Sequence, residues 1–369
     1  MNLPVLQDLS KEQLEIYGLP LKGTYLVSGP PGTGKSVMAV YRAQMQQERA
    51  PDVQVRLLMF NNTLKSYTSG AAESQGVGGA VETFHRWLPN AYRSWAGESI
   101  PRVSKWSYDW DRVVPRVIMS PPPAEAKPFL LIDEGQDLPP GFYTVVRLVT
   151  DSFTVFADEN QTLTEDNSTL TSIRDNARIG SDDEMSLKRN YRNTREIAEL
   201  ARVFYTGLAT GMPELPTKLG DRPVLKRTRD IEEAADYIAR YEGNHPLERV
   251  GVLVPDTATL DEFDRAFARR GLKNKHEFYS SKQWKRSGLD FSRPGIKMMC
   301  YQSAKGLEFD AVFIPELQRF QGDRTDDRAT MQLYVLISRA RERLYLTYSG
   351  HVEPAIIADL PPDLIEQQL

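Results

Sequence analysis

The sequence lacks several features that would assign it to a specialised class of protein. It has one cysteine, Cys300, in 369 residues, which excludes an internal disulfide framework and a zinc site built from cysteines. Its longest apolar runs, such as Phe129–Ile132, have the length of a strand, far short of the ~20 apolar residues that span a bilayer. The N-terminus has no basic segment followed by a long apolar run, so it does not resemble a secretory signal. We therefore expect a cytoplasmic protein without a membrane segment.

An excess of positive charge is also missing. The chain has 46 Lys and Arg residues against 50 Asp and Glu residues, a net charge of −4 with His neutral. Its composition, 40% hydrophobic and 26% charged, is ordinary for a soluble globular protein. Chains that coat nucleic acid are usually basic. Binding of nucleic acid would therefore need a local basic groove, because affinity depends on the phosphates neutralised at the contact.

Apolar segments alternate with amphipathic segments along most of the chain. We predict strands at Gly23–Ser28, Val53–Phe60, Phe129–Asp133, Phe153–Ala157, Val224–Thr228, Val250–Pro255, Ile296–Tyr301, Ala311–Pro315 and Leu344–Ser349. Helical patterns lie between them, for example at Lys35–Glu48, Thr194–Ala209, Ile231–Arg240 and Thr259–Arg270. This alternation predicts an α/β fold with parallel sheets that helices cover on both faces. Proline-rich loops are expected at Ser120–Pro128 and Pro213–Pro223, and a fraying tail at Pro361–Leu369.

Two segments depart from the alternation. Trp87–Trp110 contains four of the five tryptophans, and Arg269–Arg286 interleaves Arg and Lys with aromatic residues. Each could be a surface on which aromatic rings stack on bases while cations follow the phosphates of a single strand. The first could equally be a small packed subdomain and the second a solvated charged face. The sequence leaves both interpretations open.

The segment Gly29–Ser36 reads Gly-Pro-Pro-Gly-Thr-Gly-Lys-Ser and matches the pattern G-x-x-x-x-G-K-[ST]. It follows a predicted strand and opens a predicted helix, the context in which this pattern binds phosphates. Glycines let backbone N–H groups turn toward phosphate oxygens, and the helix N-terminus adds a favourable dipole. Lys35 would reach the β- and γ-phosphates, and the Ser36 hydroxyl would bind Mg²⁺. We expect ATP to be held by Gly29, Pro30, Pro31, Gly32, Thr33, Gly34, Lys35 and Ser36.

The second motif is acidic and follows the apolar run Phe129–Ile132. Asp133 and Glu134 begin its string Asp-Glu-Gly-Gln-Asp. In parallel sheets, ligands bind beyond the carboxyl ends of the strands. Asp133 would therefore hold Mg²⁺, and Glu134 would orient or deprotonate the attacking water. A water-activating carboxylate favours an ATP hydrolase over a kinase.

Further short motifs occur in a fixed order along the chain. They are Gln13 in Leu9–Gln13, Met59–Leu64, Val81–His85, Asp133–Asp137, Phe156–Gln161, Leu187–Thr194, Gln302–Phe309 and Tyr334–Arg341. Their order resembles superfamily 1 DNA helicases of the UvrD/Rep type, and the resemblance extends over most of the chain. Each shorter string is weak evidence, whereas the joint order is specific.

This resemblance implies two tandem RecA-like P-loop NTPase domains that use ATP and Mg²⁺. The first would span residues 1–185, with a small aromatic-rich insertion at about 87–117, and the second residues 186–356, followed by a tail at 357–369. Lys35, Glu134, Gln161, Arg192 and Arg339 would be catalytic, with the two arginines stabilising the charge that develops on the γ-phosphate and Gln161 sensing that phosphate. The nucleotide would also contact Gln13, Tyr191, Gly306 and Glu308.

The resemblance further implies a groove for single-stranded DNA, and RNA is compatible with the same groups. The residues that match groove positions are Phe60, Asn61, Thr83, His85 and Gln302. Polar groups there would hold phosphates and sugars while aromatic rings stack on bases, without reading sequence. The expected function is an ATP-dependent single-strand translocase or DNA helicase.

The chain also departs from the family pattern. Ala157 stands where relatives have glycine, Val37 stands where many have arginine, and no tryptophan follows the Phe156–Gln161 motif. The distance from Leu187–Thr194 to Gln302–Phe309 leaves no room for the large accessory subdomain of longer relatives, so a compact form is expected. One alternative is therefore an ATPase subunit of a repair or phage-defence complex that does not unwind alone and works with a partner such as a nuclease. Another is a nucleotide-switched nucleic-acid-binding module.

Overall fold

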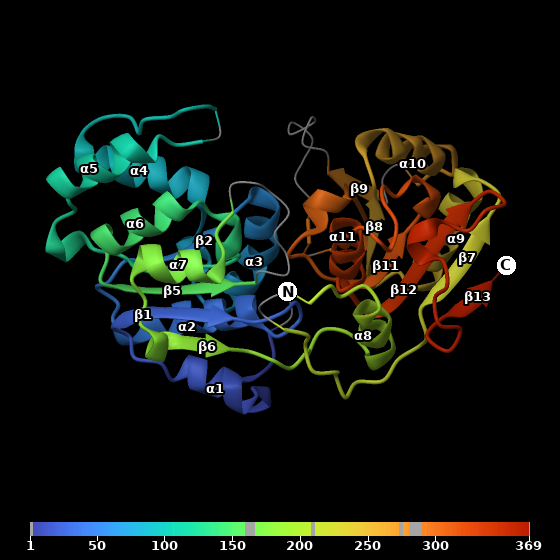
Figure 1. Cartoon of the computed structure of the whole chain (residues 1–369), viewed down its shortest axis with the longest axis horizontal. Coiled ribbons are helices and arrows are strands. Elements are labelled where there is room, and N and C mark those ends of the chain that lie inside the picture. The colour runs from blue at the N-terminus through green and yellow to red at the C-terminus, as the bar shows by residue number, and fades with distance from the viewer. Residues whose placement is uncertain are drawn as a thin grey trace. The chain divides into compact units, whose positions relative to one another are not determined.

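The computed structural model of the chain describes residues 3–105, 107–158, 167–207, 211–272, 276–279, 290–291 and 293–368. The chain divides into two compact units, and each contains one sheet (Figure 1). Unit 1 comprises Met1–Pro30 and Gly34–Lys188, and unit 2 comprises Pro31–Thr33 and Arg189–Leu369. Each unit is described by itself below.

Unit 1 is built on a six-stranded sheet in the order β3-β2-β4-β5-β1-β6, with every pair parallel. Its strands are β1 (Gly23–Ser28), β2 (Val55–Met59), β3 (Val81–Thr83), β4 (Phe129–Ile132), β5 (Ser152–Ala157) and β6 (Glu184–Ser186). Its helices are α1 (Lys11–Tyr17), α2 (Lys35–Arg49), α3 (Asn62–Ser74), α4 (Phe84–Ala96), α5 (Trp110–Met119), α6 (Pro140–Val149) and α7 (Leu170–Ala177).

The central strands of unit 1 are buried on both faces. All four residues of β4 are buried, and successive side chains of a strand point to opposite faces of the sheet. Leu130 and Ile132 belong to a buried cluster with side chains of α4 to α7, such as Phe142. Leu131 points to the other face, which α2 covers. Helices on both faces explain why the apolar run is continuous instead of alternating.

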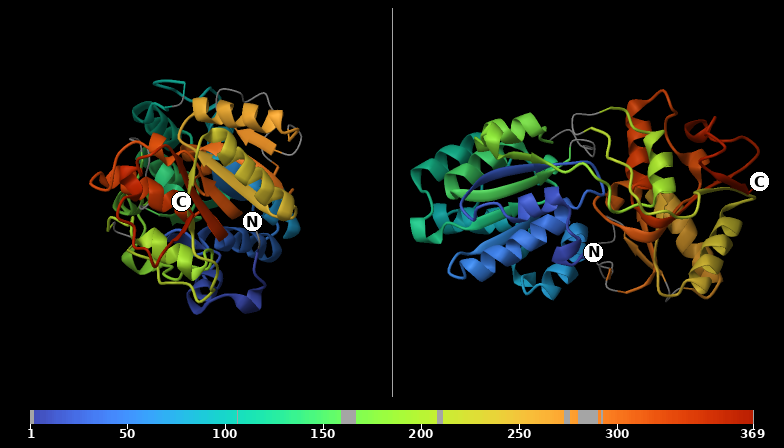
Figure 2. Two further views of the ribbon diagram at one scale, coloured as in Figure 1. Left: turned by 90° about the vertical axis from the view of Figure 1, so that its right-hand side faces the viewer. Right: turned by 90° about the horizontal axis from the view of Figure 1, so that it is seen from below.

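Unit 2 is built on a seven-stranded parallel sheet in the order β13-β7-β12-β11-β8-β10-β9. Its strands are β7 (Val224–Thr228), β8 (Arg249–Val254), β9 (His276–Tyr279), β10 (Gly295–Cys300), β11 (Phe309–Ile314), β12 (Ala340–Ser349) and β13 (Glu366–Gln368). Its helices are α8 (Arg195–Arg202), α9 (Ile231–Asn244), α10 (Thr257–Arg269) and α11 (Asp327–Ile337). Helices α9 and α10 pack together on one face of the sheet, and α8 packs against α11 on the other (Figure 2).

The two sheets follow the same topology. When the extra edge strand β9 is set aside, strands β7, β8, β10, β11, β12 and β13 take the places of β1, β2, β3, β4, β5 and β6. The chain therefore contains two copies of one α/β architecture. The predicted α/β class with parallel sheets is confirmed. The topology also shows which loops correspond in the two units.

All nine predicted strands are present, with shifts of a few residues at their ends. The strands missed from the sequence are β3, β6, β9 and β13, each four residues or shorter. The predicted helix at Thr194–Ala209 is too long, because α8 ends at Arg202. The predicted tail is also wrong: Ile357 and Ile365 are buried, and β13 pairs with β7 through Glu366–Gln368.

No helix in the described part of the chain is long and apolar enough to cross a membrane.

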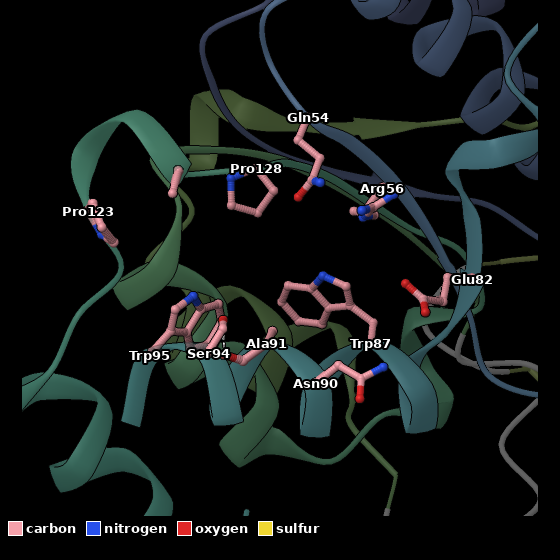
Figure 3. Close-up of a pocket in the computed structure, with 11 residues that line it drawn as sticks. Gln54, Arg56, Glu82, Trp87, Asn90, Ala91, Ser94, Trp95, Pro123 and Pro128 are labelled. Carbon is pink, nitrogen blue, oxygen red and sulfur yellow. Dashed lines mark hydrogen bonds between the residues drawn. The ribbon is translucent and has the colours of Figure 1, made fainter. Parts of the chain in front are cut away.

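The predicted insertion forms α4 and α5, which lie beside each other and next to α6 (Figure 1). Trp87 and Tyr92 are buried, and the ring of Trp87 meets that of Trp95 edge-on at 6.0 Å. For these residues the packed-subdomain interpretation holds. Trp87 and Trp95 also line a hollow of about 450 Å³ at the edge of the sheet, opposite Gln54 and Arg56 (Figure 3). Trp106 lies outside the described residues.

The basic segment Arg269–Arg286 is described only in part. Arg269 pairs with Glu232, and Arg270 pairs with Glu232 and Asp236. These ion pairs on α9 fit a solvated charged face for this part of the segment. Residues 273–275 and 280–289, with most of the predicted cations and Trp284, lie outside the described residues.

Candidate nucleotide and nucleic-acid sites

The predicted phosphate loop, Gly29–Ser36, lies where β1 passes into α2. Gly32 and Gly34 have φ angles of 84° and 93°, in the left-handed region that favours glycine. A Cβ atom on Gly34 would lie 2.5 Å from Nε2 of Gln13, so any other residue would strain the backbone and also displace the Gln13 amide. Helix α2 begins directly after Gly34, with Lys35 as its first residue.

The Lys35 ammonium is held inside the loop. Nζ donates hydrogen bonds to the carbonyls of Gly29 at 2.5 Å and Pro30 at 3.0 Å. It also lies 3.7 Å from a carboxylate oxygen of Asp158, which is fully buried at the end of β5. The lysine is 7% exposed. Its charge is thus fixed beside the phosphate loop by groups of unit 1 alone.

The two predicted acids follow β4 and are buried, with Asp133 2% and Glu134 4% exposed. Burial raises the pKa of Asp133, and the charge of Glu134 raises it further, to about 7. A hydrogen bond with Ser36 and the charge of Lys35 act in the opposite direction but are outweighed. A hydroxyl and a carboxylate that meet in this way are hard oxygen donors of the kind that Mg²⁺ prefers. Ser36 and Asp133 therefore fit the predicted metal, and a bound cation would favour the ionised form of Asp133.

Gln136, to which the sequence assigned no role, joins this acidic turn to the next strand. Its Nε2 donates to Oε2 of Glu134 at 2.6 Å, and its Oε1 accepts from the N–H of Asp158 at 2.9 Å. Gln136 is completely buried. The predicted water-activating carboxylate is therefore braced by a side chain that also contacts the end of β5.

Gln13 lies against the phosphate loop from the N-terminal side. It completes a capping box with Ser10 at the start of α1, and its amide nitrogen faces Gly34. Arg42 holds this segment in place, because its buried guanidinium donates to the carbonyls of Ile16, Leu19 and Pro20 at 3.0–3.2 Å. Burial lowers the pKa of Arg42 to about 10. Nothing in the sequence distinguishes Arg42 from a surface arginine.

In unit 2, two predicted nucleotide residues pair with each other. The Arg192 guanidinium contacts Oε1 of Glu308 through Nη2 at 2.6 Å and Nε at 2.8 Å. Burial by itself raises the pKa of Glu308, but the charge and hydrogen bond of Arg192 outweigh burial and hold it at about 2. Both side chains are therefore charged and oriented over a wide pH range.

The other predicted nucleotide residues of unit 2 differ in exposure. Tyr191 is 42% exposed, and Gly306 has a φ of 74° in the turn before β11. Arg339 is completely buried, where it donates to the carbonyls of Val335 at 2.9 Å and Leu307 at 3.4 Å. Gln161 lies outside the described residues.

Four of the predicted nucleic-acid residues follow adjacent strands of unit 1. Phe60 and Asn61 follow β2, and Thr83 and His85 lie where β3 passes into α4. The rings of Phe60 and His85 are 6.0 Å apart, while Asn61 caps α3 by accepting from the N–H of Leu64. Gln302 is exposed in the turn after β10 of unit 2.

A short hairpin of the insertion continues this group of residues. Arg102 pairs with Tyr108 in an antiparallel bridge, and its guanidinium lies 4.5 Å above the Tyr108 ring. The Tyr108 ring is 6.3 Å from His85. Burial lowers the pKa of His85, and the charge of Arg102 lowers it further, so both disfavour the charged form of the imidazole. In the described part of the chain, exposed Arg102 forms no ion pair with a carboxylate.

A comparison with known protein families supports the predicted resemblance over one segment of the chain. Residues 301–347, from the turn after β10 to near the end of β12, match the family described as the UvrD-like helicase C-terminal domain. A comparison with curated proteins gives no match. Among solved structures, the chain is similar to the C-terminal domain of a possible DNA helicase from Lactobacillus plantarum WCFS1. The two sequences are 21% identical, and the match covers 48% of this chain and 99% of that chain with a TM-score of 0.38. The family match indicates a helicase-related function.

Proposed function

We propose that the chain is an ATP hydrolase that couples turnover to movement along single-stranded nucleic acid. The observation that carries this proposal is the arrangement in unit 1, where the phosphate loop, Lys35 and the acidic turn of Glu134 are joined by hydrogen bonds and an ion contact. The helicase-type match at residues 301–347 supports the coupling to nucleic acid.

The residues of unit 1 divide the chemistry between them. The glycines and Lys35 would bind the phosphates, and Ser36 with Asp133 would hold Mg²⁺, which neutralises phosphate charge when bound. Glu134 would accept the proton of the attacking water. Arg192 and Arg339 would supply positive charge to the transition state, and Gln13, Tyr191 and Glu308 would hold the nucleoside.

Steady-state ATP hydrolysis by the purified chain tests this proposal. Turnover with Mg²⁺ should increase when oligo-dT is added, since strand binding would favour the hydrolytic state of the protein. Oligo-U in a parallel assay compares RNA with DNA. Hydrolysis that no single strand stimulates would contradict the coupling and favour a nucleotide-switched binding module.

A second candidate is a translocase that does not unwind duplexes without a partner. The short distance between Thr194 and Gln302, which has no room for a large accessory subdomain, favours it. Strand displacement from a tailed duplex, measured with and without added nuclease candidates, separates the two functions. Unwinding by the chain alone would argue against this candidate.

Arg339→Ala should lower kcat for ATP by ~10³-fold, the scale on which arginine fingers act. Because Arg339 is buried and bonded to the carbonyls of Val335 and Leu307, the melting temperature has to be measured alongside turnover. Arg341→Ala, two residues further along and half-buried in its pair with Asp310, is the control and should stay close to the parental rate. A loss below tenfold in a folded Arg339→Ala protein would assign the role elsewhere.

Arg102→Ala should weaken binding of single strands and make it less dependent on salt. If the guanidinium contacts one phosphate, the slope of log K against log salt should become smaller by about 0.7. Fluorescence anisotropy with labelled oligo-dT over a range of salt concentrations measures this slope. Arg93→Ala, at an exposed position of α4 in the same insertion, is the control. An unchanged slope in Arg102→Ala would remove the hairpin from the binding surface.

Glu308→Gln should lower the free energy of unfolding by roughly 3 kcal/mol at pH 7, from a folded pKa of about 2 against an ordinary 4.5. A lowered pKa stabilises the fold above the unfolded value, so the difference between the two proteins should shrink as the pH falls from 4.5 toward 2. Urea unfolding at several pH values measures it. A difference that stays constant down to pH 3 would show that the charge pair is not its source.

A further inference from the structure

The turn that carries Glu134 occurs twice in the chain. In unit 1, β4 ends at Ile132, Glu134 has φ 52° and ψ 44°, and a short 3-10 helix follows at Gly135–Asp137. In unit 2, the corresponding strand β11 ends at Ile314, Glu316 has φ 58° and ψ 40°, and a 3-10 helix follows at Leu317–Arg319. A left-handed backbone is uncommon for glutamate. Its recurrence at corresponding positions shows that the two turns share one local backbone geometry.

The hydrogen bonds of the two turns correspond as well. Gln318 Nε2 donates to Oε2 of Glu316 at 2.8 Å, as Gln136 does to Glu134 at 2.6 Å. Gln318 Oε1 accepts from the N–H of Ser349 at the end of β12 at 3.0 Å. Gln136 accepts likewise from Asp158 after β5, the corresponding strand, at 2.9 Å. In each unit a glutamine two residues after the glutamate braces its carboxylate against the neighbouring strand.

Only one of the two braces lies beside a phosphate loop. The loop Gly29–Gly34 separates β1 from α2 and carries the predicted triphosphate site. In unit 2, only Arg229 and Asp230 separate β7 from α9, which leaves no room for such a loop. The brace in unit 2 thus forms where no phosphate loop exists, so its geometry is a property of the fold and does not depend on a bound nucleotide.

We propose that Gln136 is a positioning residue that fixes the Glu134 carboxylate for its work on the attacking water before the nucleotide binds. This inference rests on the proposed ATP hydrolysis. The Gln136 amide nitrogen holds Glu134, and its amide oxygen holds the backbone N–H of Asp158 at the end of β5. The Asp158 carboxylate in turn lies 3.7 Å from Lys35 Nζ. One buried amide therefore ties the acid to the strand that meets the phosphate-binding lysine. Preorganised groups of this kind act without reorganisation during the reaction.

Gln136→Met tests the proposal, since methionine has a similar volume but neither hydrogen-bonding group. We expect kcat for ATP to fall by about 100-fold, the scale of a 1 Å misplacement of a reacting group, while the dissociation constant for a fluorescent ATP analogue changes little. Gln136→Asn, which keeps the amide but is one methylene shorter, should give a smaller loss and serves if the methionine variant does not fold. Gln318→Met is the matched control, because it removes the corresponding brace in unit 2, and its kcat should remain close to the parental value.

A double-mutant cycle distinguishes positioning from a general structural effect. If Gln136 acts through Glu134, Gln136→Met should cause no further loss of the single-turnover rate in a Glu134→Gln background. An equal loss in both backgrounds, a parental kcat in Gln136→Met, or an equal loss in Gln318→Met would overturn the inference while leaving ATP hydrolysis intact. Absence of turnover in the unmodified chain would instead overturn the proposed function together with this inference.

Discussion

Lys35→Ala is expected to remove ATP hydrolysis, to the level of a sample without protein. The ammonium is held by the carbonyls of Gly29 and Pro30 and by the carboxylate of Asp158, so its position does not depend on the substrate. A cation placed here in advance would interact with the β- and γ-phosphates throughout the reaction. Alanine removes the charge and leaves the Asp158 carboxylate without this neighbour. Phosphate release measured at saturating ATP tests the prediction.

The control for Lys35→Ala has to separate lost chemistry from lost folding. Thermal unfolding followed by circular dichroism should show that the variant remains folded. Lys11→Ala, at a lysine whose side chain is 92% exposed on α1, should hydrolyse ATP at the parental rate. Substantial turnover by a folded Lys35→Ala protein would mean that Gly29–Ser36 is not the phosphate site.

Glu134→Gln is expected to separate binding from turnover. The substitution removes the basic carboxylate but keeps the size of the side chain, so ATP should still bind with nearly parental affinity. The rate should fall by about 10³- to 10⁴-fold, toward the upper end of what general base catalysis contributes. Equilibrium binding of a fluorescent ATP analogue and single-turnover hydrolysis are the two measurements.

A carboxylate in the second copy of the turn provides the control for Glu134→Gln. Glu316→Gln changes the same residue type in the same left-handed conformation, but in the sheet where no such loop separates β7 from α9, so turnover should be retained. Hydrolysis by Glu134→Gln at the parental rate would show that another group activates the water. Loss of ATP binding in this variant would show instead that Glu134 serves the nucleotide pocket.

The sequence predicted the interior of the fold well because the interior strands are apolar. Phe129–Ile132 is buried in full and can be recognised from its composition alone. The missed edge strand β13, Glu366–Gln368, consists of polar residues that join the sheet only through backbone pairing with β7. The end of α8 at Arg202 was missed because the helical pattern of the sequence continues beyond it.

The candidate site could be predicted only where the signal is local. The glycines and Lys35 follow from one continuous motif, and the structure places them between β1 and α2 as expected. The role of Gln136 depends on β5 lying next to β4, which no local pattern reveals. The burial of Arg339 and Arg42 was also missed. From sequence alone an arginine is expected at the surface, because the backbone carbonyls that accept its hydrogen bonds are not known.

Movement along a single strand is measured most directly by the time the protein takes to arrive at a labelled end. The chain is bound to oligo-dT of several lengths with a fluorophore at one terminus, and ATP with Mg²⁺ is added in a stopped-flow instrument. We expect a delay that grows in proportion to strand length and disappears in Lys35→Ala. Hydrolysis that is stimulated by the strand, but with a fluorescence change that does not depend on its length, would contradict it.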